Sequence, residues 1–156
     1  MLKLFSDLAA ALGVQHIRTM GDGYLAVSGV PSYRSDHAQA AARLAQAMVD
    51  IAAATPGPGG APLQVRVGLH SGPVAAGVMG AFNLHYDVWG PTVSLAARME
   101  QTGSPSQIQV SQACAEALHG FYRVEPRGEV HAKGIGTVHT WWLGEPLSGS
   151  LASPEG

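Results

Sequence analysis

The chain is poor in charged residues. Only 13% of its 156 residues are Asp, Glu, Lys or Arg, against about 25% in an average soluble domain. The formal net charge is −2, so the chain as a whole has no positive excess for contacting nucleic acid or an anionic membrane surface. The composition therefore argues against a nucleic-acid-binding protein.

Cysteine and long apolar runs are also scarce. Cys114 is the single cysteine, which excludes a disulfide within the chain and fits a reducing compartment. No apolar run is long enough to span a bilayer, and the first residues lack the pattern of a secretory signal peptide. We therefore expect a cytoplasmic protein without a membrane segment in this chain.

The length and apolar content are those of one ordinary domain. A chain of 156 residues that is 46% hydrophobic can bury a substantial core. The apolar spacing predicts, in order, a helix, a hairpin, a helix, two strands, a helix, a strand, a helix and final strands. This order indicates an α+β fold with one largely antiparallel sheet and helices packed on it. Residues 146–156 are rich in Ser, Gly and Pro and predict a disordered tail, which leaves the domain at 1–145.

Local signals refine several of these elements. Ser35 precedes an alanine-rich helical pattern and is expected to cap it. Residues 63–69 alternate as in a strand, so that Arg66 points away from the neighbouring valines. The sequence favours neither a solvated Arg66 on the strand surface nor an Arg66 that binds a ligand. Residues 121–130 resemble a strand that its proline and glycine interrupt.

A predicted hairpin over residues 14–27 places Asp22 at its tip. The turn is Gly21-Asp22-Gly23, and Asp before Gly is common in tight turns for conformational reasons alone. A carboxylate on a rigid turn also suits Mg²⁺. Turn chemistry is the commoner explanation, and the residues alone leave the metal interpretation open.

The segment 85–100 contains a more specific combination. Asp87 lies just before a Trp-Gly-Pro sequence that predicts the start of a helix. Ser94 and Arg98 are four residues apart and share a helix face. A carboxylate, a hydroxyl and a guanidinium in one cleft could bind a base edge and phosphate oxygens. The alternative is a turn aspartate beside a solvated arginine.

Several segments taken together resemble the catalytic domain of class III nucleotide cyclases, the adenylate/guanylate cyclase family. They keep the family's order over residues 2–144 and comprise residues 17–24, 66–74, 77–80, 86–100 and Lys133-Gly134. The resemblance implies a ferredoxin-like domain that acts as a dimer with its active site at the interface. It also implies that the ribose 3′-oxygen attacks the α-phosphate of a nucleoside triphosphate, with two Mg²⁺ or Mn²⁺ ions and cationic donors assisting.

The resemblance implies metal, base and transition-state roles for individual residues. Asp22 is similar to the second of the family's two metal-binding aspartates. Asp87 matches the acceptor for the adenine amino group, and Arg18 the donor to the adenine ring. Arg98 matches the arginine that stabilises the transition state, with Ser94 at a second catalytic position.

Two further cations match residues that contact phosphate. Arg66 matches a triphosphate-binding arginine, and Lys133 a phosphate-contacting lysine. In a homodimer, Asp22 and Arg66 of one subunit are expected to meet the other site residues across the interface.

The chain departs from the family pattern in three ways. The family's central first strand, which carries the other metal aspartate, is expected before residue 1, and its loss should leave unpaired backbone groups and an apolar gap. Ser94 stands where active members usually have Asn, a change that can cost on the order of 10²–10³ in rate. Arg18 stands where adenylate cyclases usually have Lys, and ATP remains favoured over GTP.

Two functions from different classes follow. The first is a nucleotide cyclase that makes cyclic AMP in intracellular signalling. The alternative is a non-catalytic cyclase-homology module that binds nucleotide or forms a homodimer or heterodimer with a competent partner. Because one metal-site carboxylate is missing, we expect the 156-residue chain alone to have little or no activity.

Overall fold

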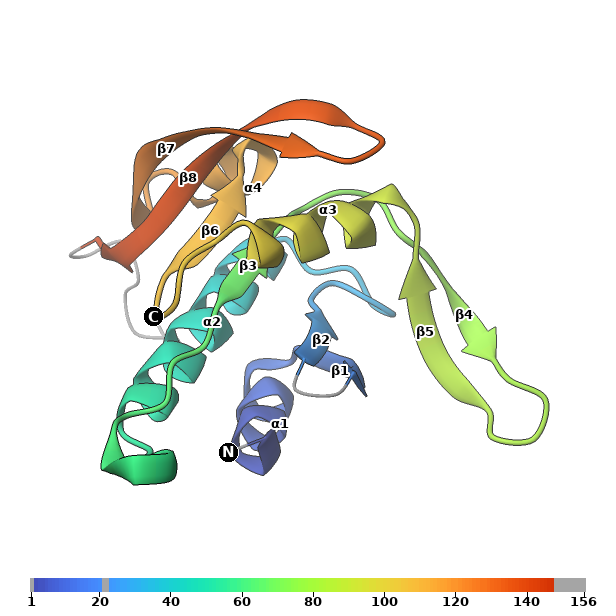
Figure 1. The fold of residues 1–156 in the computed structure, drawn as a ribbon. Helices are drawn as coiled ribbons and strands as arrows, with labels where there is room; N and C mark the ends of the chain where they lie inside the picture. Colours follow the sequence, from blue (N-terminus) through green and yellow to red (C-terminus); the bar gives the residue numbers. More distant parts are fainter. Residues whose placement is uncertain (1, 21–22, 148–156) are drawn as a thin grey trace.

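The computed structural model describes residues 2–20 and 23–147, and in this part of the chain helices alternate with short strands and hairpins (Figure 1). The elements are α1 (Leu2–Leu12), β1 (Gln15–Met20), β2 (Gly23–Val27), α2 (His37–Ala53), the 3₁₀ turn η1 (Pro58–Gly60), β3 (Val67–Leu69), β4 (Ala75–Met79), β5 (His85–Trp89), α3 (Pro91–Gln101), β6 (Ile108–Ser111), α4 (Gln112–Leu118), β7 (Tyr122–Ala132) and β8 (Gly136–Pro146).

In the described residues, the strands form three separate sheets. β1 pairs with β2 and β4 pairs with β5, each as an antiparallel hairpin, and the third sheet has the order β3-β6-β8-β7. Its β3–β6 pair is parallel, whereas β6–β8 and β7–β8 are antiparallel. The α+β class and the predominance of antiparallel pairing are therefore confirmed, but the one sheet expected from the sequence is divided.

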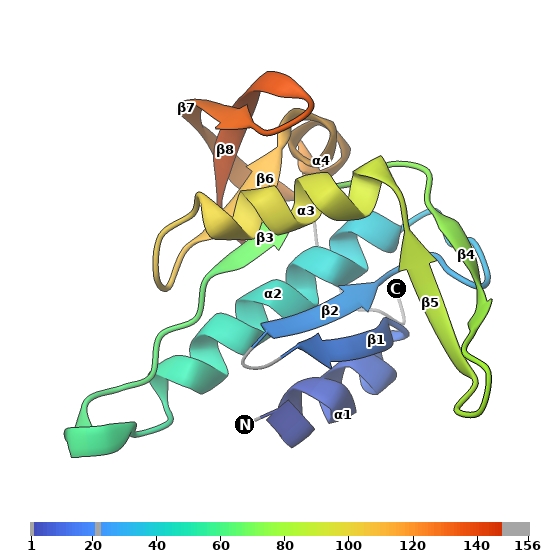
Figure 2. The same ribbon diagram turned by 45° about the vertical axis from the view of Figure 1, so that its right-hand side comes forward.

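Helix α2 lies between two clusters of buried side chains and contributes to both. Its Ala42 and Ala45 pack with Val110 and other residues of β6, α4 and β8. On another side, Leu44 and Met48 of α2 pack with residues of α1. Figure 2 shows α2 passing behind the β1–β2 hairpin and below α3. Because many side chains of α2 are small, this one helix can pack against both clusters of buried side chains.

Three local predictions needed correction. The residue that caps α2 is Asp36, not Ser35, and it makes no side-chain capping bond, because Arg34 holds its carboxylate at 2.7 and 2.9 Å. The strand expected over 63–69 is limited to its last three residues. The interruption expected in 121–130 is absent, because β7 continues through a register shift between Pro126 and Gly128.

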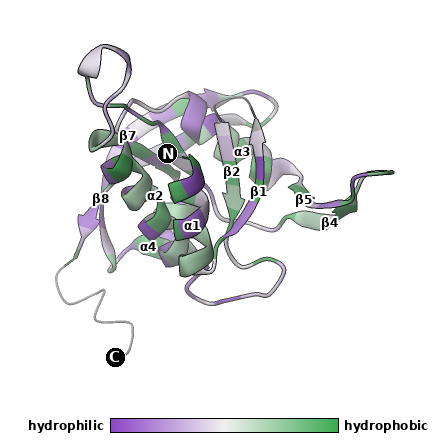
Figure 3. Ribbon diagram, turned by 90° about the horizontal axis from the view of Figure 1, so that it is seen from below, coloured by the Kyte–Doolittle hydropathy of each residue, from purple (hydrophilic) through white to green (hydrophobic). Residues whose placement is uncertain are grey.

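The β4–β5 hairpin projects from the body of the domain as an arm (Figure 1). Large apolar side chains along it are exposed, with exposed fractions of 66% for Val78, 97% for Phe82 and 69% for Leu84. In Figure 3 the arm extends away from the helices and carries hydrophobic residues at its end. Several large apolar side chains exposed on one projecting hairpin are typical of an interaction site.

Candidate functional site

Arg18 of β1 and Asp87 of β5 form an ion pair that joins two of the hairpins. A guanidinium nitrogen of Arg18 donates to Asp87 Oδ1. The same oxygen accepts the backbone N–H of Val88 at 2.8 Å. The other carboxylate oxygen lies 3.9 Å from His85 Nε2. Because the Asp87 side chain is only 20% exposed, the donors from Arg18 and Val88 fix it in place. The structure thus brings together the two residues expected to contact the base.

Helix α3 presents Ser94 and Arg98 on one face. Gly90 caps its start at φ 116°, a conformation that favours glycine, and Pro91 occupies the first turn. The exposed Ser94 hydroxyl donates to the Gly90 carbonyl at 3.4 Å. Arg98 Nε donates to the backbone carbonyl of His131 at 3.1 Å. Ser94 and Arg98 therefore lie four residues apart on one face of α3, as expected.

The contact of Arg98 with β7 also brings it toward Lys133. Lys133 follows His131 by two residues in the turn between β7 and β8, and its side chain is exposed. Two residues span at most about 7 Å of chain. Neither Arg98 nor Lys133 makes an ion pair with a carboxylate in the described part of the chain. Two cations without acidic partners therefore lie at the same end of the domain.

Arg66 lies on a different side of α3. Its Nε donates to Glu100 Oε2 at 2.8 Å, and Glu100 is roughly opposite Arg98 around the helix. The close approach of β3 to α3 at Gly68 makes this pairing possible, since a Cβ there would lie 2.1 Å from the Glu100 nitrogen. Within one copy of the chain, Arg66 therefore does not join Arg98 and Lys133.

The predicted metal site is not assembled by the described residues. Asp22 lies outside them. Within residues 2–20 and 23–147, no group of three His, Cys, Asp or Glu side chains is placed to hold a metal ion. The described residues by themselves therefore do not form a two-metal centre, and the predicted ligand Asp22 is not among them.

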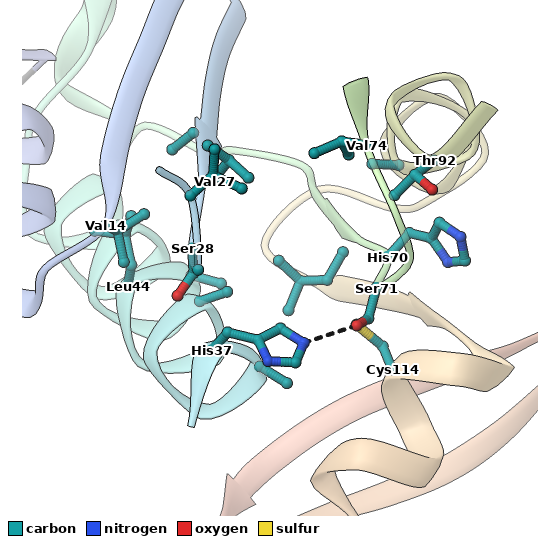
Figure 4. Close-up of a pocket in the computed structure, with 18 of the residues that line it drawn as sticks. Val14, Val27, Ser28, His37, Leu44, His70, Ser71, Val74, Thr92 and Cys114 are labelled. Carbon is teal, nitrogen blue, oxygen red and sulfur yellow. Dashed lines mark hydrogen bonds between the residues drawn. The ribbon is translucent and has the colours of Figure 1, made fainter. Parts of the chain in front are cut away.

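A cavity of about 540 Å³ separates β2 from β3. Figure 4 shows Val27 and Ser28 on one wall and His70, Ser71 and Val74 on the other. His37 and Ser71 are hydrogen-bonded across one end, with 2.9 Å between His37 Nε2 and Ser71 Oγ. In the described part of the chain, β2 pairs only with β1 and β3 only with β6. The space is partly open to solvent, so water can enter it.

The sequence model of the family described as "Adenylate and Guanylate cyclase catalytic domain" matches residues 1–145. The chain belongs to this family. It is 45% identical over 139 residues to an adenylate cyclase of Mycobacterium tuberculosis, covering 89% of this chain and 31% of that one. It is 38% identical over 151 residues to the human guanylate cyclase soluble subunit beta-2, covering 95% and 24%. The chain thus spans less than a third of these relatives.

Solved structures agree with the cyclase fold. The guanylate cyclase domain of RhGC from Catenaria anguillulae, in complex with GTP, superposes with a TM-score of 0.88 at 32% identity, covering 94% of this chain and 80% of that one. The ferredoxin-like cyclase architecture expected from the sequence is thereby confirmed. None of the helices in the described part of this cyclase chain is long and apolar enough to cross a membrane. The cytoplasmic location, the domain boundary at 145 and the site roles stay predictions.

Sequence reasoning missed three features of this cyclase site. Glu100 was overlooked as the partner of Arg66 because 34 residues separate them. Gly68 was noted only as an alternating strand residue, and its contact with α3 has no local signal. His85, by contrast, could have been found, because side chains two residues apart in a strand face the same side as Asp87.

Proposed function

We propose that this domain is a nucleotide cyclase that converts ATP to 3′,5′-cyclic AMP and pyrophosphate. In this reaction the 3′-oxygen forms a bond to the α-phosphorus and loses its proton, and the bond from that phosphorus to the pyrophosphate oxygen breaks. The observation that carries the proposal is the Arg18–Asp87 pair beside α3. It offers a donor and an acceptor to a base edge at one end of a helix whose other end carries free cationic charge.

The Arg18–Asp87 pair supports a purine substrate. Adenine can donate its amino group to the Asp87 carboxylate while its ring nitrogen accepts from Arg18. Guanine could present its ring N–H to Asp87 and its carbonyl oxygen to Arg18 instead. The match of Asp87 to the family's adenine-reading position, together with the similarity to an adenylate cyclase, favours ATP.

Arg98 and Lys133 are proposed to bind the phosphates. Arg98 is held by a neutral carbonyl rather than by a carboxylate, so its full charge can act on phosphate oxygens, whose negative charge shifts as the bond breaks. Lys133 extends from the adjacent turn as a second donor. A divalent cation, Mg²⁺ or Mn²⁺, would supply further charge neutralisation if bound, and Asp22, its expected ligand, lies outside the described residues.

A dimer is proposed because, within one copy of the chain, Arg66 lies apart from Arg98 and Lys133. Arg66 faces away from Arg98 across α3, so both can reach one triphosphate only if two copies contribute. The exposed apolar arm offers the kind of surface that dimerisation buries, with Val78, Phe82 and Leu84 uncovered. Residues of different copies would then share each site, as a homodimer or as a heterodimer with a related cyclase chain.

The proposal is tested by nucleotide binding on matched variants. Fluorescent ATP and GTP analogues are titrated into the chain and into Asp87→Ala and Lys133→Gln. The controls are Asp7→Ala and Lys3→Gln, because Lys3 and Asp7 form an exposed ion pair on α1. We expect each site variant to weaken ATP binding by about tenfold, equivalent to about 1.4 kcal/mol, and the controls to bind normally. Unchanged binding by both site variants would contradict the proposed site.

Product assays distinguish a catalytic cyclase from a non-catalytic cyclase-homology module. Cyclic AMP and cyclic GMP are measured with Mg²⁺ or Mn²⁺ for the chain and for a longer form expressed from its native reading frame. Cyclic AMP from the longer form supports the cyclase. The non-catalytic module is the second candidate. Ser94, at a position where active members usually have Asn, donates its hydroxyl to the Gly90 carbonyl, and nucleotide binding without turnover in both forms would support this candidate.

A further inference from the structure

The C-terminal end of α3 is held by one buried side chain, that of Gln109 on β6. Its amide nitrogen donates to the Met99 carbonyl at 2.9 Å and to the Thr102 hydroxyl at 2.7 Å. The Thr102 hydroxyl in turn donates to the Arg98 carbonyl at 2.8 Å. The last carbonyls of a helix lack partners within it. These bonds therefore supply side-chain donors to the helical turn that carries Arg98.

Arg127 of β7 completes the hydrogen bonds of Gln109. A guanidinium nitrogen of Arg127 donates to Gln109 Oε1, and its guanidinium carbon lies 5.1 Å from the centre of the Trp142 ring. A guanidinium can only donate and the Met99 carbonyl can only accept, so one orientation of the Gln109 amide satisfies both. Because Gln109 is 0% exposed, an amide that lost these partners would stay unsatisfied.

A bulge in β7 sets the direction of Arg127. Pro126 and Gly128 pair with consecutive residues of β8, Trp141 and Thr140. Arg127 is therefore the extra residue at this register shift. The buried Thr140 donates its hydroxyl to the Gly128 carbonyl at 2.7 Å and stabilises the irregular backbone. Bulges redirect a side chain in this way and are frequent next to active sites.

Strand β7 thus contacts the end of α3 by two routes. The direct route is the bond from Arg98 Nε to the His131 carbonyl at 3.1 Å. The indirect route runs from Arg127 through Gln109 to the last turn of α3. Figures 1 and 2 both show the β7–β8 hairpin above α3. Since Lys133 follows His131 by two residues, the strand that holds Arg98 continues into the turn that bears Lys133.

We propose that Arg127 and Gln109 are positioning residues that hold the end of α3, and with it Arg98, in place beside the β7–β8 turn. They act through Arg98, because the guanidinium of Arg127 is already engaged by Gln109 and the Trp142 ring. A displacement of about 1 Å remote from the chemistry can cost on the order of 10² in rate. The consequence for ATP rests on the proposed function, whereas the placement of Arg98 does not.

The placement of Arg98 can be followed by the NMR signal of its Nε–H, which is assigned by its loss in Arg98→Lys. Arg127→Met keeps an apolar stem over Trp142 and removes the donor to Gln109. Arg127 is exposed, so this variant should fold. We expect hydrogen exchange of the Arg98 Nε–H to become at least about fivefold faster, because its bond to the His131 carbonyl opens more often.

Two controls separate positioning from a general loss of stability. Arg123→Met makes the same substitution on β7 at an arginine paired with Glu125 and Glu145, and should change the exchange of the Arg98 Nε–H less than about twofold. The Nε–H of Arg34, bonded to Asp36 at 2.7 Å elsewhere in the fold, is the reference signal within each variant. An unchanged rate at Arg98 in Arg127→Met, or an equal acceleration at Arg34, would overturn the proposal.

Titration with a fluorescent ATP analogue tests the consequence for the phosphate site. Arg127→Met should weaken binding by about fivefold in the parent chain, and less than about twofold in Arg98→Ala, where no guanidinium remains to be positioned. Equal weakening in both backgrounds would mean that Arg127 acts without Arg98 and would contradict the proposal. If Arg98→Ala itself leaves ATP binding unchanged, the phosphate role of Arg98 fails, and the exchange rates alone support or overturn the positioning.

Discussion

Replacing Gly68 with alanine should displace α3 and destabilise the domain. A Cβ at this position would lie 2.1 Å from the Glu100 nitrogen, 2.6 Å from the Met99 carbonyl carbon and 2.8 Å from the Ala96 oxygen. All three atoms belong to backbone, so no side-chain rotation can relieve the contact. Restoring ordinary contact at about 3.4 Å requires α3 to move by about 1.3 Å relative to β3.

This movement has a cost that can be estimated. Overpacking in a well-packed core typically costs about 1–3 kcal/mol and sometimes more. The buried Gln109 side chain also donates to the Met99 carbonyl at 2.9 Å and to the Thr102 hydroxyl at 2.7 Å, and both bonds would be strained. We expect a loss of about 3 kcal/mol or more, and therefore a fall in Tm of about 6–12 °C for a domain of this size.

Gly77→Ala provides the matched control for this prediction. Gly77 is also a strand glycine, but a Cβ there would meet only the Trp89 ring at 3.5 Å, an ordinary contact. Alanine should change the stability at this position by less than about 1 kcal/mol. Urea and thermal unfolding of both variants check the contrast. If Gly68→Ala is as mild as Gly77→Ala, the close packing of β3 on α3 is wrong, together with the placement of Arg66 that depends on it.

Three further predictions concern titratable and exposed groups. Burial raises the pKa of the Cys114 thiol to about 12, so a thiol reagent at pH 8 should label it only as the domain unfolds, and rapid labelling of the folded chain would be inconsistent with this. Burial lowers the pKa of His70, so the folded state disfavours the charged imidazole and stability should fall as the pH drops below about 6.5. In urea titrations at pH 7 and pH 5, His70→Gln should lose less stability than the parent, and an equal loss would refute this. Phe82→Ser should weaken self-association in light scattering while Tyr33→Ser, which removes an exposed aromatic outside the arm, should not, and the reverse result would exclude the arm as the dimer surface.

The segment around α3 could be predicted from sequence because its determinants are local. Gly90 and Pro91 set the start of the helix, and the spacing of Ser94 and Arg98 sets their shared face. Such signals act within one or two turns of chain. The partners of these residues were not predictable in the same way. The carbonyl that accepts from Arg98 belongs to His131, 33 residues away, and backbone acceptors leave no mark in sequence.

The alternating pattern of residues 63–69 likewise predicted only part of the structure there. Residues 63–66 alternate like the three residues of β3, yet they form no ladder, because Leu63 donates to the Thr55 carbonyl and the Val65 carbonyl accepts from Ser106. Alternation predicts which face a side chain takes, and the exposed Arg66 beside partly buried Val65 follows it. Whether a segment forms a strand depends on a partner strand to bond with, and the tertiary structure decides which partner is available.

Because the chain has few charged residues, the cationic side chains that are not paired with a carboxylate should dominate its attraction for phosphate. Arg66 and Arg18 each already contact a carboxylate, so an incoming anion has to compete with Glu100 or Asp87 for them. Arg98 and Lys133 form no ion pair with a carboxylate among the described residues, so no such pairing weakens their attraction for phosphate. A triphosphate should therefore be attracted first to the end of α3 and the β7–β8 turn. The base can then displace part of the Arg18–Asp87 pair once the phosphates are held. Raising ionic strength should accordingly slow nucleotide association for the parent chain more than for Lys133→Gln, and equal salt dependence would argue against this order of contacts.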